Sequence, residues 1–204
     1  MDNAVTLVQA YLRLNGYFTV TEFPIVEANK GGGHRTATDI DVLAVRFPGA
    51  GRLVPRKGGS AKNDRLLGGL DTALGISLDD ADMIIGEVKE GRAQINHGAR
   101  DPSVLRAALT RFGCCNEEHV DTLVESLIRN GHGQTLNGHR VRLVAFGSSL
   151  PETNPGYHTI SLGHIIEFAS AYLEDHWDVF RVTEFKDPAL GFLATMIKSS
   201  QTHL

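Results

Sequence analysis

The segment from Ala81 to Glu90, ADMIIGEVKE, constrains the fold of this 204-residue chain more than any other stretch. It begins with the apolar run Met83-Ile84-Ile85, which is typical of a buried strand. Glu87 and Lys89 follow two residues apart, and they share one face of that strand because successive side chains alternate. Charged side chains at the end of a buried strand are costly unless they are paired or bind a ligand. The segment therefore predicts a sheet strand that carries a polar site.

A second strand with acidic residues precedes this segment in the chain. Residues 38–45 (TDIDVLAV) place Asp39 and Asp41 on one face, at the start of a β-branched and apolar run. If the two strands pair, Asp41, Glu87 and Lys89 converge, with Asp39 one step outside. A divalent cation and a phosphate would use these groups together, since carboxylates bind the metal and a lysine can orient a water.

The chain contains a second Glu-x-Lys, Glu184-Phe185-Lys186, which serves as an internal comparison. It lacks an upstream strand with acidic residues. An ordinary surface ion pair is the alternative interpretation for both motifs, and such a pair contributes only about 0–1 kcal/mol.

The pattern Asp41 … Glu87-Val88-Lys89 resembles the PD-(D/E)xK nuclease superfamily, which includes restriction endonucleases, Holliday-junction resolvases and nuclease-related (NERD) domains. The resemblance covers about residues 3–147. It implies an α/β fold with a central mixed β-sheet flanked by helices, a restriction-endonuclease-like core in the order αβββαβ. Two features depart from the pattern: Ile40 stands where many members have proline, and the gap from Asp41 to Glu87 is long for a hairpin.

The resemblance also implies a function, a Mg²⁺- or Mn²⁺-dependent nuclease that hydrolyses phosphodiester bonds of DNA. Asp41, Glu87 and the backbone carbonyl of Val88 would hold the metal, and Lys89 would assist the attacking water. The alternative is a catalytically inactive nuclease-fold subunit that binds nucleic acid or acts as a scaffold in a larger complex. RNA stays open as a substrate, because phosphate contacts are common to both nucleic acids. A chain without a separate DNA-reading domain is expected to act as a homodimer or as a subunit of a larger assembly.

Four further residues are candidates for this site: Glu27, Asp39, Arg92 and Gln94. Members of the superfamily often add an acid from the first helix or strand, and Glu27 is favoured over Glu22 because it is nearer the turn into the Asp41 strand. Asp39 either adds a ligand or marks the strand entry. In some members a polar residue after the motif contacts the scissile phosphate, which indicates Arg92 or Gln94, although either could lie in a solvated turn.

Residues 48–80 form an unusually long connection between the two acidic strands. The connection holds seven glycines and five basic residues: Arg52, Arg56, Lys57, Lys62 and Arg65. A connection of this length is either functional or disordered. Two interpretations stay open, a basic flap over the site that contacts nucleic-acid phosphates and a solvated linker. The leucines between residues 64 and 74 predict a short helix.

Hydrophobic periodicity and turn residues predict the other elements. We expect helices over residues 3–14, after Asp101-Pro102, after Asn116, over 162–173 and over 189–198. Strands are expected over 17–27, 36–47 and 179–185, with Pro24 at an edge or a bulge, and residues 148–160 are expected to be a loop. Asn137-Gly138 predicts a hairpin with a type I′ turn that ends in a core strand over 141–146. Residues 1–204 are expected to form a single domain whose C-terminal extension, about 161–204, supplies extra helices.

The composition restricts the remaining possibilities. With 42% hydrophobic residues, 22% charged residues and a net charge of -4, the chain should be an ordinary soluble protein whose phosphate-binding face is local. No long apolar run or signal peptide is evident, so no membrane association and a cytoplasmic location are expected. The adjacent Cys114 and Cys115 cannot close a loop, and a structural role is favoured over a reactive one. The nine histidines show no zinc-binding spacing, and the chain has no P-loop.

Overall fold

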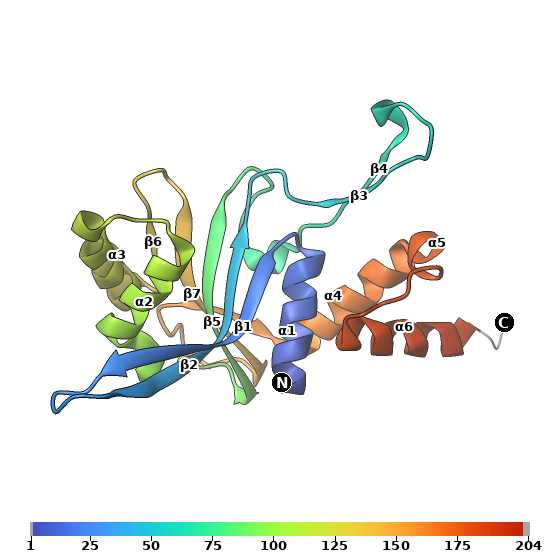
Figure 1. Ribbon diagram of the computed structural model, residues 1–204. Helices are drawn as coiled ribbons and strands as arrows, with labels where there is room; N and C mark the ends of the chain where they lie inside the picture. The colour runs from blue at the N-terminus through green and yellow to red at the C-terminus, as the bar shows by residue number, and fades with distance from the viewer. Residues whose placement is uncertain (1, 202–204) are drawn as a thin grey trace.

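The computed structural model describes residues 2–201 and has an α/β architecture, in which helices flank both faces of a curled mixed sheet (Figure 1). The strands follow the order β1-β2-β5-β7-β6, and β8 also pairs with β7. Their bounds are β1 (Phe18–Ala28), β2 (His34–Arg46), β5 (Asp82–Arg92), β6 (His132–Gln134), β7 (Arg140–Ser149) and β8 (His158–Ser161). β2 is antiparallel to both β1 and β5, whereas β5 and β7 are parallel.

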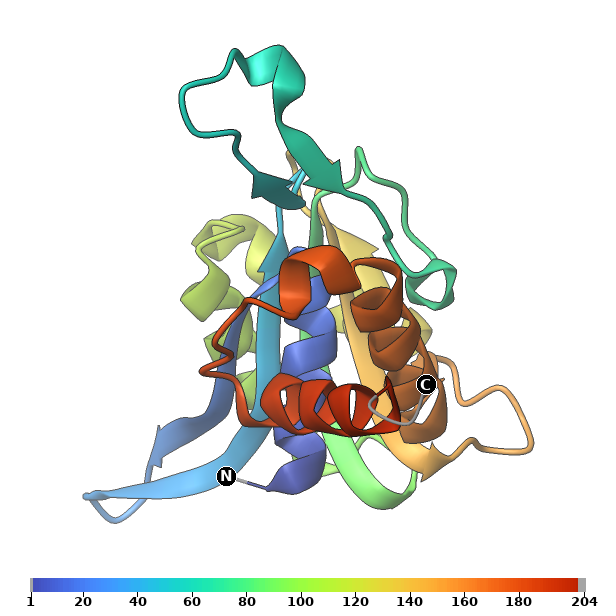
Figure 2. The same ribbon diagram turned by 90° about the vertical axis from the view of Figure 1, so that its right-hand side faces the viewer.

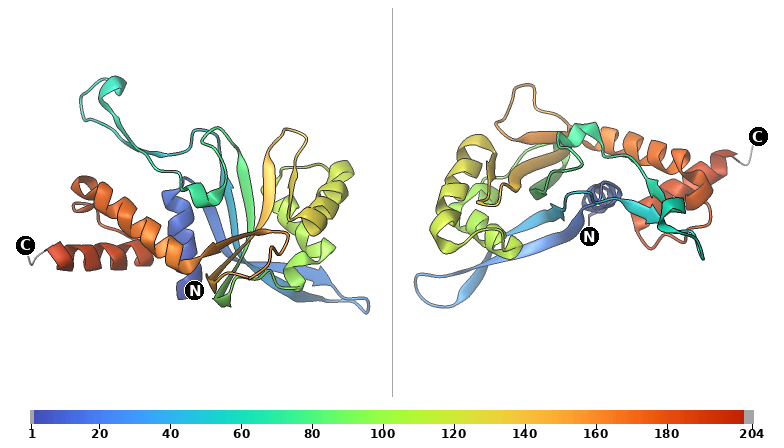
Figure 3. Two further views of the ribbon diagram at one scale, coloured as in Figure 1. Left: turned by 180° about the vertical axis from the view of Figure 1, so that it is seen from behind. Right: turned by 90° about the horizontal axis from the view of Figure 1, so that it is seen from above.

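The helices form two layers with the sheet between them (Figure 3, right). One layer contains α1 (Asn3–Leu14), α4 (Leu162–Asp175), α5 (Trp177–Phe180) and α6 (Pro188–Gln201). The other contains α2 (Pro102–Phe112) and α3 (Glu117–Asn130). Both faces of β5 are buried, because Ile84 packs with α1 and α4 while Ile85 packs with α2 and α3. The prediction of a mixed sheet flanked by helices is therefore confirmed. None of the helices within residues 2–201 has both the length and the apolar character that crossing a membrane requires.

The helix boundaries follow the predicted capping residues. Asp101 accepts a hydrogen bond from the Ser103 N–H (2.8 Å) at the start of α2, where Pro102 is the first helical residue. Gly131 ends α3 with φ +72°, a conformation that favours glycine. These local signals fix where a helix begins and ends without reference to the rest of the fold.

The helix predicted over residues 64–74 is wrong. The connection instead forms a two-stranded hairpin of β3 (Arg52–Val54) and β4 (Arg65–Leu67), followed by a 3₁₀ turn, η2 (Thr72–Leu74). Leu66 is exposed and Leu67 is buried, which is the alternation of a strand. Gly68-Gly69 then disfavours continuation as a helix.

Three other local predictions need correction. Residues 179–185 do not form a strand; α5 ends there, and Phe180 packs against Tyr172 and Phe185 instead of joining a sheet. The loop expected over 148–160 contains the start of β8. The 137–138 turn forms, yet only its glycine has a positive φ (+76°), so the turn is not type I′.

β1 and β2 extend beyond the sheet as a two-stranded ribbon (Figure 1, blue). They pair from Phe18↔Val45 to Ala28↔His34, whereas β2 pairs with β5 only from Arg46 to Val42. Pro24 lies on β1, at the edge of the sheet, as predicted, and the register shifts between Ile25 and Val26.

A buried ion pair joins β5 and β7 at the other end of these strands. The guanidinium of Arg142 donates from Nε and Nη2 to the two carboxylate oxygens of Asp82, both at 2.9 Å. The Tyr17 hydroxyl donates to the same carboxylate at 2.5 Å, and burial raises the pKa of Tyr17 above its usual range, so it stays a donor. Arg142 Nη1 also donates to the Leu74 carbonyl (2.8 Å) and so ties the connection to the sheet.

We expect Asp82→Asn to destabilise the protein by about 3–5 kcal/mol, because it leaves the buried Arg142 charge without its partner. Urea unfolding at pH 7 measures this change. Asp178→Asn is the matched control, since Asp178 pairs with Arg65 at the surface, and its midpoint should not move. Equal effects of the two substitutions would contradict the importance of the buried pair.

Candidate functional site

The candidate site lies where β2 separates from β5. The last pair between these strands is Val42↔Gly86, and a Cβ at Gly86 would lie 2.5 Å from Val42 Cγ1, so only glycine allows this close approach. One residue further on, Asp41 Oδ2 accepts a hydrogen bond from the backbone N–H of Val88 (2.7 Å). The side chain of Asp41 thus occupies the place that a continued β2 backbone would take.

Glu87 is the most deeply buried charged group of the site. Its side chain is 2% exposed, and Oε1 accepts hydrogen bonds from Lys89 Nζ and from Asn96 Nδ2, both at 2.6 Å. The other oxygen, Oε2, is buried and has no hydrogen-bond partner among the described residues. A buried acceptor without a partner costs about 1–3 kcal/mol, and more when it is charged.

The electrostatics of Glu87 agree with this geometry. Burial raises the pKa of Glu87, and the nearby charge of Asp41 raises it further, while the contacts with Lys89 and Asn96 act in the opposite direction. A cation beside the two carboxylates would offset both the burial and the repulsion.

The carboxylate oxygens of Asp41 and Glu87 are ligands that fit a Mg²⁺ or Mn²⁺ ion. Mg²⁺ typically takes one or two carboxylates and keeps several waters, and Asp41 and Glu87 supply two carboxylates. The N–H and C=O of a strand residue point to the same edge, so the Val88 carbonyl faces the side on which Asp41 lies. Within residues 2–201 no group of three or more His, Cys, Asp or Glu side chains is placed to hold a metal. A four-ligand zinc site is therefore not formed by the described residues.

The structure brings Asp41, Glu87 and Lys89 together but not the other acids. Asp39 is exposed and lies opposite Pro24 on the ribbon. Glu27, the favoured extra acid, pairs with Arg35 (2.6 Å), and Arg35 is six residues from Asp41 along β2, about 20 Å.

Glu22, not Glu27, is the acid on β1 nearest to Asp41. It lies between Thr21 and Phe23, which pair with Val42 and Ile40, and its φ of +52° is the only positive φ of a non-glycine residue among the described residues. Such a backbone conformation is strained and recurs at functional sites.

Asn96 is a site residue that the sequence did not reveal. Arg92 and Gln94, the two predicted polar residues, are exposed, whereas Asn96 contacts Glu87 directly. Asn96 Oδ1 also accepts a hydrogen bond from the Ala99 N–H (2.6 Å), which fixes Asn96 against the turn η3 (Gly98–Arg100). An asparagine just before a tight turn is a recognisable signal, but the contact with Glu87 depends on how the chain returns across the sheet.

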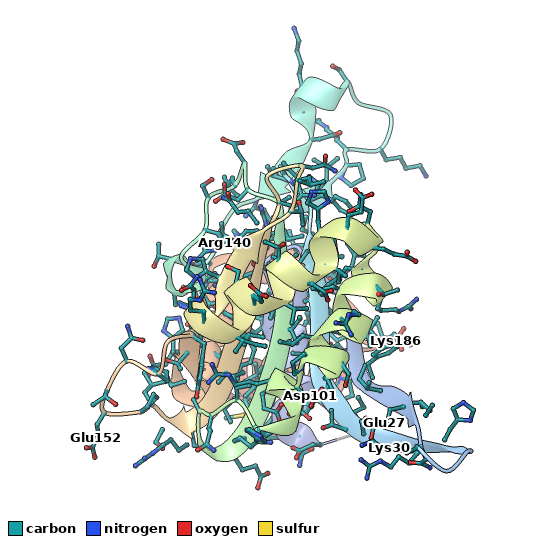
Figure 4. The ribbon with its side chains drawn as sticks, turned by 90° about the vertical axis from the view of Figure 1, so that its left-hand side faces the viewer. Glu27, Lys30, Asp101, Arg140, Glu152 and Lys186 are labelled. Carbon is teal, nitrogen blue, oxygen red and sulfur yellow. The ribbon has the colours of Figure 1, made fainter. Side chains whose placement is uncertain are left out.

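The basic connection does not cover the site, so the flap interpretation is wrong. It joins the Arg46 end of β2 to the Asp82 end of β5, opposite the Asp41 and Glu87 end. In Figure 4, Arg140, whose register partner is Asp82, lies near the upper end, whereas Glu27 and Lys30 of the ribbon lie at the lower end. Figure 2 shows the β3–β4 hairpin projecting from the top of the molecule.

Two other groups that the sequence singled out, the second Glu-x-Lys and the adjacent cysteines, lack the features of the candidate site. Glu184 and Lys186 also form an ion pair (2.8 Å), but they are 85% and 81% exposed. Burial raises the pKa of Cys114 to about 12, with Cys115 adding to the shift, which makes the Cys114 thiol a poor nucleophile at neutral pH.

No protein-family model, curated protein or solved structure matches this chain.

The raised pKa of Glu87 predicts a pH-dependent stability. Folded Glu87 keeps its proton to a higher pH than unfolded Glu87, whose pKa is about 4.3. The free energy of unfolding therefore falls as pH rises from about 4.3 through the folded pKa, and the loss persists above it. Without metal, we expect Glu87→Gln to melt at a higher temperature than the native protein at pH 7–8, and the difference to disappear near pH 4.

Thermal unfolding in EDTA measures this effect, with Glu184→Gln as the exposed control. Glu184→Gln should track the native protein at every pH. A Glu87→Gln variant that is less stable than the native protein at pH 7 would show that the carboxylate stabilises the fold.

Proposed function

We propose that this protein is a metal-dependent nuclease of the PD-(D/E)xK type that hydrolyses phosphodiester bonds of DNA. The observation that carries the proposal is the buried Glu87 carboxylate with its unpartnered Oε2, beside Asp41 and paired with Lys89, where two strands part. The order α1, β1, β2, β5, α2, β7 is consistent with a restriction-endonuclease-like core, in which the β3–β4 hairpin and α3 are insertions.

In this proposal Asp41, Glu87 and the Val88 carbonyl would hold Mg²⁺ or Mn²⁺. The bound cation would lower the pKa of a coordinated water and stabilise charge on the phosphate. The Val88 N–H orients the Asp41 carboxylate, and Asn96 orients the Glu87 carboxylate.

Lys89 supplies the positive charge that the chain itself directs at the phosphate. Its side chain is 40% exposed while its Nζ lies 2.6 Å from Glu87, so it contacts both the buried carboxylate and solvent. An ammonium has three donors, and those not directed at Glu87 can hold a phosphate oxygen or orient a water.

One observation favours the second candidate, an inactive nuclease-fold subunit that binds nucleic acid or acts as a scaffold. Glu87 Oε1 and Asp41 Oδ2 already accept hydrogen bonds from the chain itself, which is how a purely structural cluster is satisfied. Cleavage and metal binding measured on the same variants separate the two candidates.

We expect the native chain to cut plasmid or single-stranded DNA with Mg²⁺ or Mn²⁺, and Lys89→Ala and Asp41→Ala each to lower the rate at least about 100-fold. Lys186→Ala, from the exposed Glu-x-Lys, should cut like the native chain. Cutting that survives both site substitutions would contradict the assignment. An absence of both cutting and metal binding would favour the scaffold, and metal binding without cutting would indicate a missing partner subunit.

Asn96→Ala should weaken Mn²⁺ binding about 10- to 100-fold, because residues that orient a metal ligand commonly contribute this much. Calorimetric titration of the metal measures the effect without any substrate. Gln94→Ala is the control, since Gln94 is exposed near the same turn. The reverse result, with Gln94 required and Asn96 dispensable, would contradict the role of Asn96.

A further inference from the structure

The five basic residues of the connection divide into two that anchor the hairpin and three that do not. The Arg52 guanidinium lies over the Phe180 ring, 5.1 Å from its centre. Arg65 forms an ion pair with Asp178 (2.5 Å) and contacts His176. Both interactions tie the hairpin strands to α5 or to the turn before it.

The alternation of the hairpin strands explains the division. Arg52 is paired with Leu67 and Val54 with Arg65, and these residues lie on the side that packs against α4 and α5. Leu53 and Leu66 are opposite each other on the exposed side. The hairpin therefore contacts α4 and α5 through one face of its two strands.

The remaining three cations lie at the tip of the hairpin, which we define as residues 55–64. Arg56, Lys57 and Lys62 are exposed, and their side chains form no ion pair or hydrogen bond within the described residues 2–201. The single acid of the tip, Asp64, accepts a hydrogen bond from the backbone N–H of Arg56 (2.9 Å). The tip thus carries a net positive charge on a chain whose total is -4.

We propose that the tip binds the phosphate backbone of nucleic acid, as an anchoring contact remote from the reacting phosphate. The inference rests on the proposed nuclease function, because a phosphodiesterase with a net negative charge needs a local positive surface to attract its substrate. Cations that project from the protein reach a polyanion before the negatively charged surface of the protein does. The adjacent glycines Gly58 and Gly59 add no side chains between these cations, and Gly58 has a φ of +71° that favours glycine.

The test is binding of a 30-base-pair duplex of arbitrary sequence, in a Lys89→Ala background that does not cut. We expect the triple variant Arg56→Ala/Lys57→Ala/Lys62→Ala to bind more weakly, and the slope of log K against log salt to become shallower by about one unit per cation removed. The charge-matched control is Lys30→Ala/Arg129→Ala/Lys186→Ala, which removes three exposed cations elsewhere and should retain the native slope.

An unchanged slope in the tip variant, or an equal loss in the control, would overturn the proposal. So would a tip variant that binds DNA normally but loses self-association at low salt, because that result identifies an acidic protein surface as the partner. Turnover of bis(4-nitrophenyl) phosphate with Mn²⁺ reports on the Asp41–Glu87–Lys89 site alone. Tip-dependent DNA binding without such turnover would reject the nuclease and retain the DNA-binding role of the tip. Turnover without tip-dependent binding would retain the nuclease and reject the DNA-binding role of the tip.

Discussion

β2 is hydrogen-bonded to β5 only as far as Val42 and Gly86, and the candidate site depends on the separation that follows. If the ladder continued, the Val88 N–H would bond to the β2 backbone, and the Asp41 carboxylate could not reach it. The separation also directs the outer part of β2, with β1, away from the sheet as a ribbon (Figure 1). One interruption of strand pairing therefore accompanies both the candidate site and the ribbon next to it.

Two positions on β5 show how differently a fold can treat a buried carboxylate. Asp82 accepts hydrogen bonds from Arg142 and Tyr17 on both of its oxygens, which is the arrangement of a structural ion pair. Glu87, on the same strand, has one oxygen that accepts two hydrogen bonds and one that has no hydrogen-bond partner among the described residues. The incomplete satisfaction, more than the presence of charge, distinguishes the candidate site from the buried network that holds the connection in place.

Position also separates the roles of the basic residues. The same connection contributes Arg52 and Arg65 to packing on the C-terminal helices and leaves Arg56, Lys57 and Lys62 in solvent. Because the hairpin leaves the molecule at the end of the paired strands opposite Glu87, its free cations lie away from the candidate site. In the proposed function, substrate attraction and chemistry would therefore take place at opposite ends of one sheet.

The sequence by itself determined the features that depend on neighbours in the chain. Capping residues such as Asp101 and Gly131 set helix ends, and the period of two along β5 put Glu87 and Lys89 on one face. Only the tertiary structure decided which distant groups meet. It brought Asn96 to Glu87, made Glu22 instead of Glu27 the acid of β1 nearest to Asp41, and placed the basic connection away from the site. Residues 64–74 and 179–185 were misassigned for the same reason: their apolar side chains are buried by docking on α4 and α5, and local periodicity carries no information about that surface.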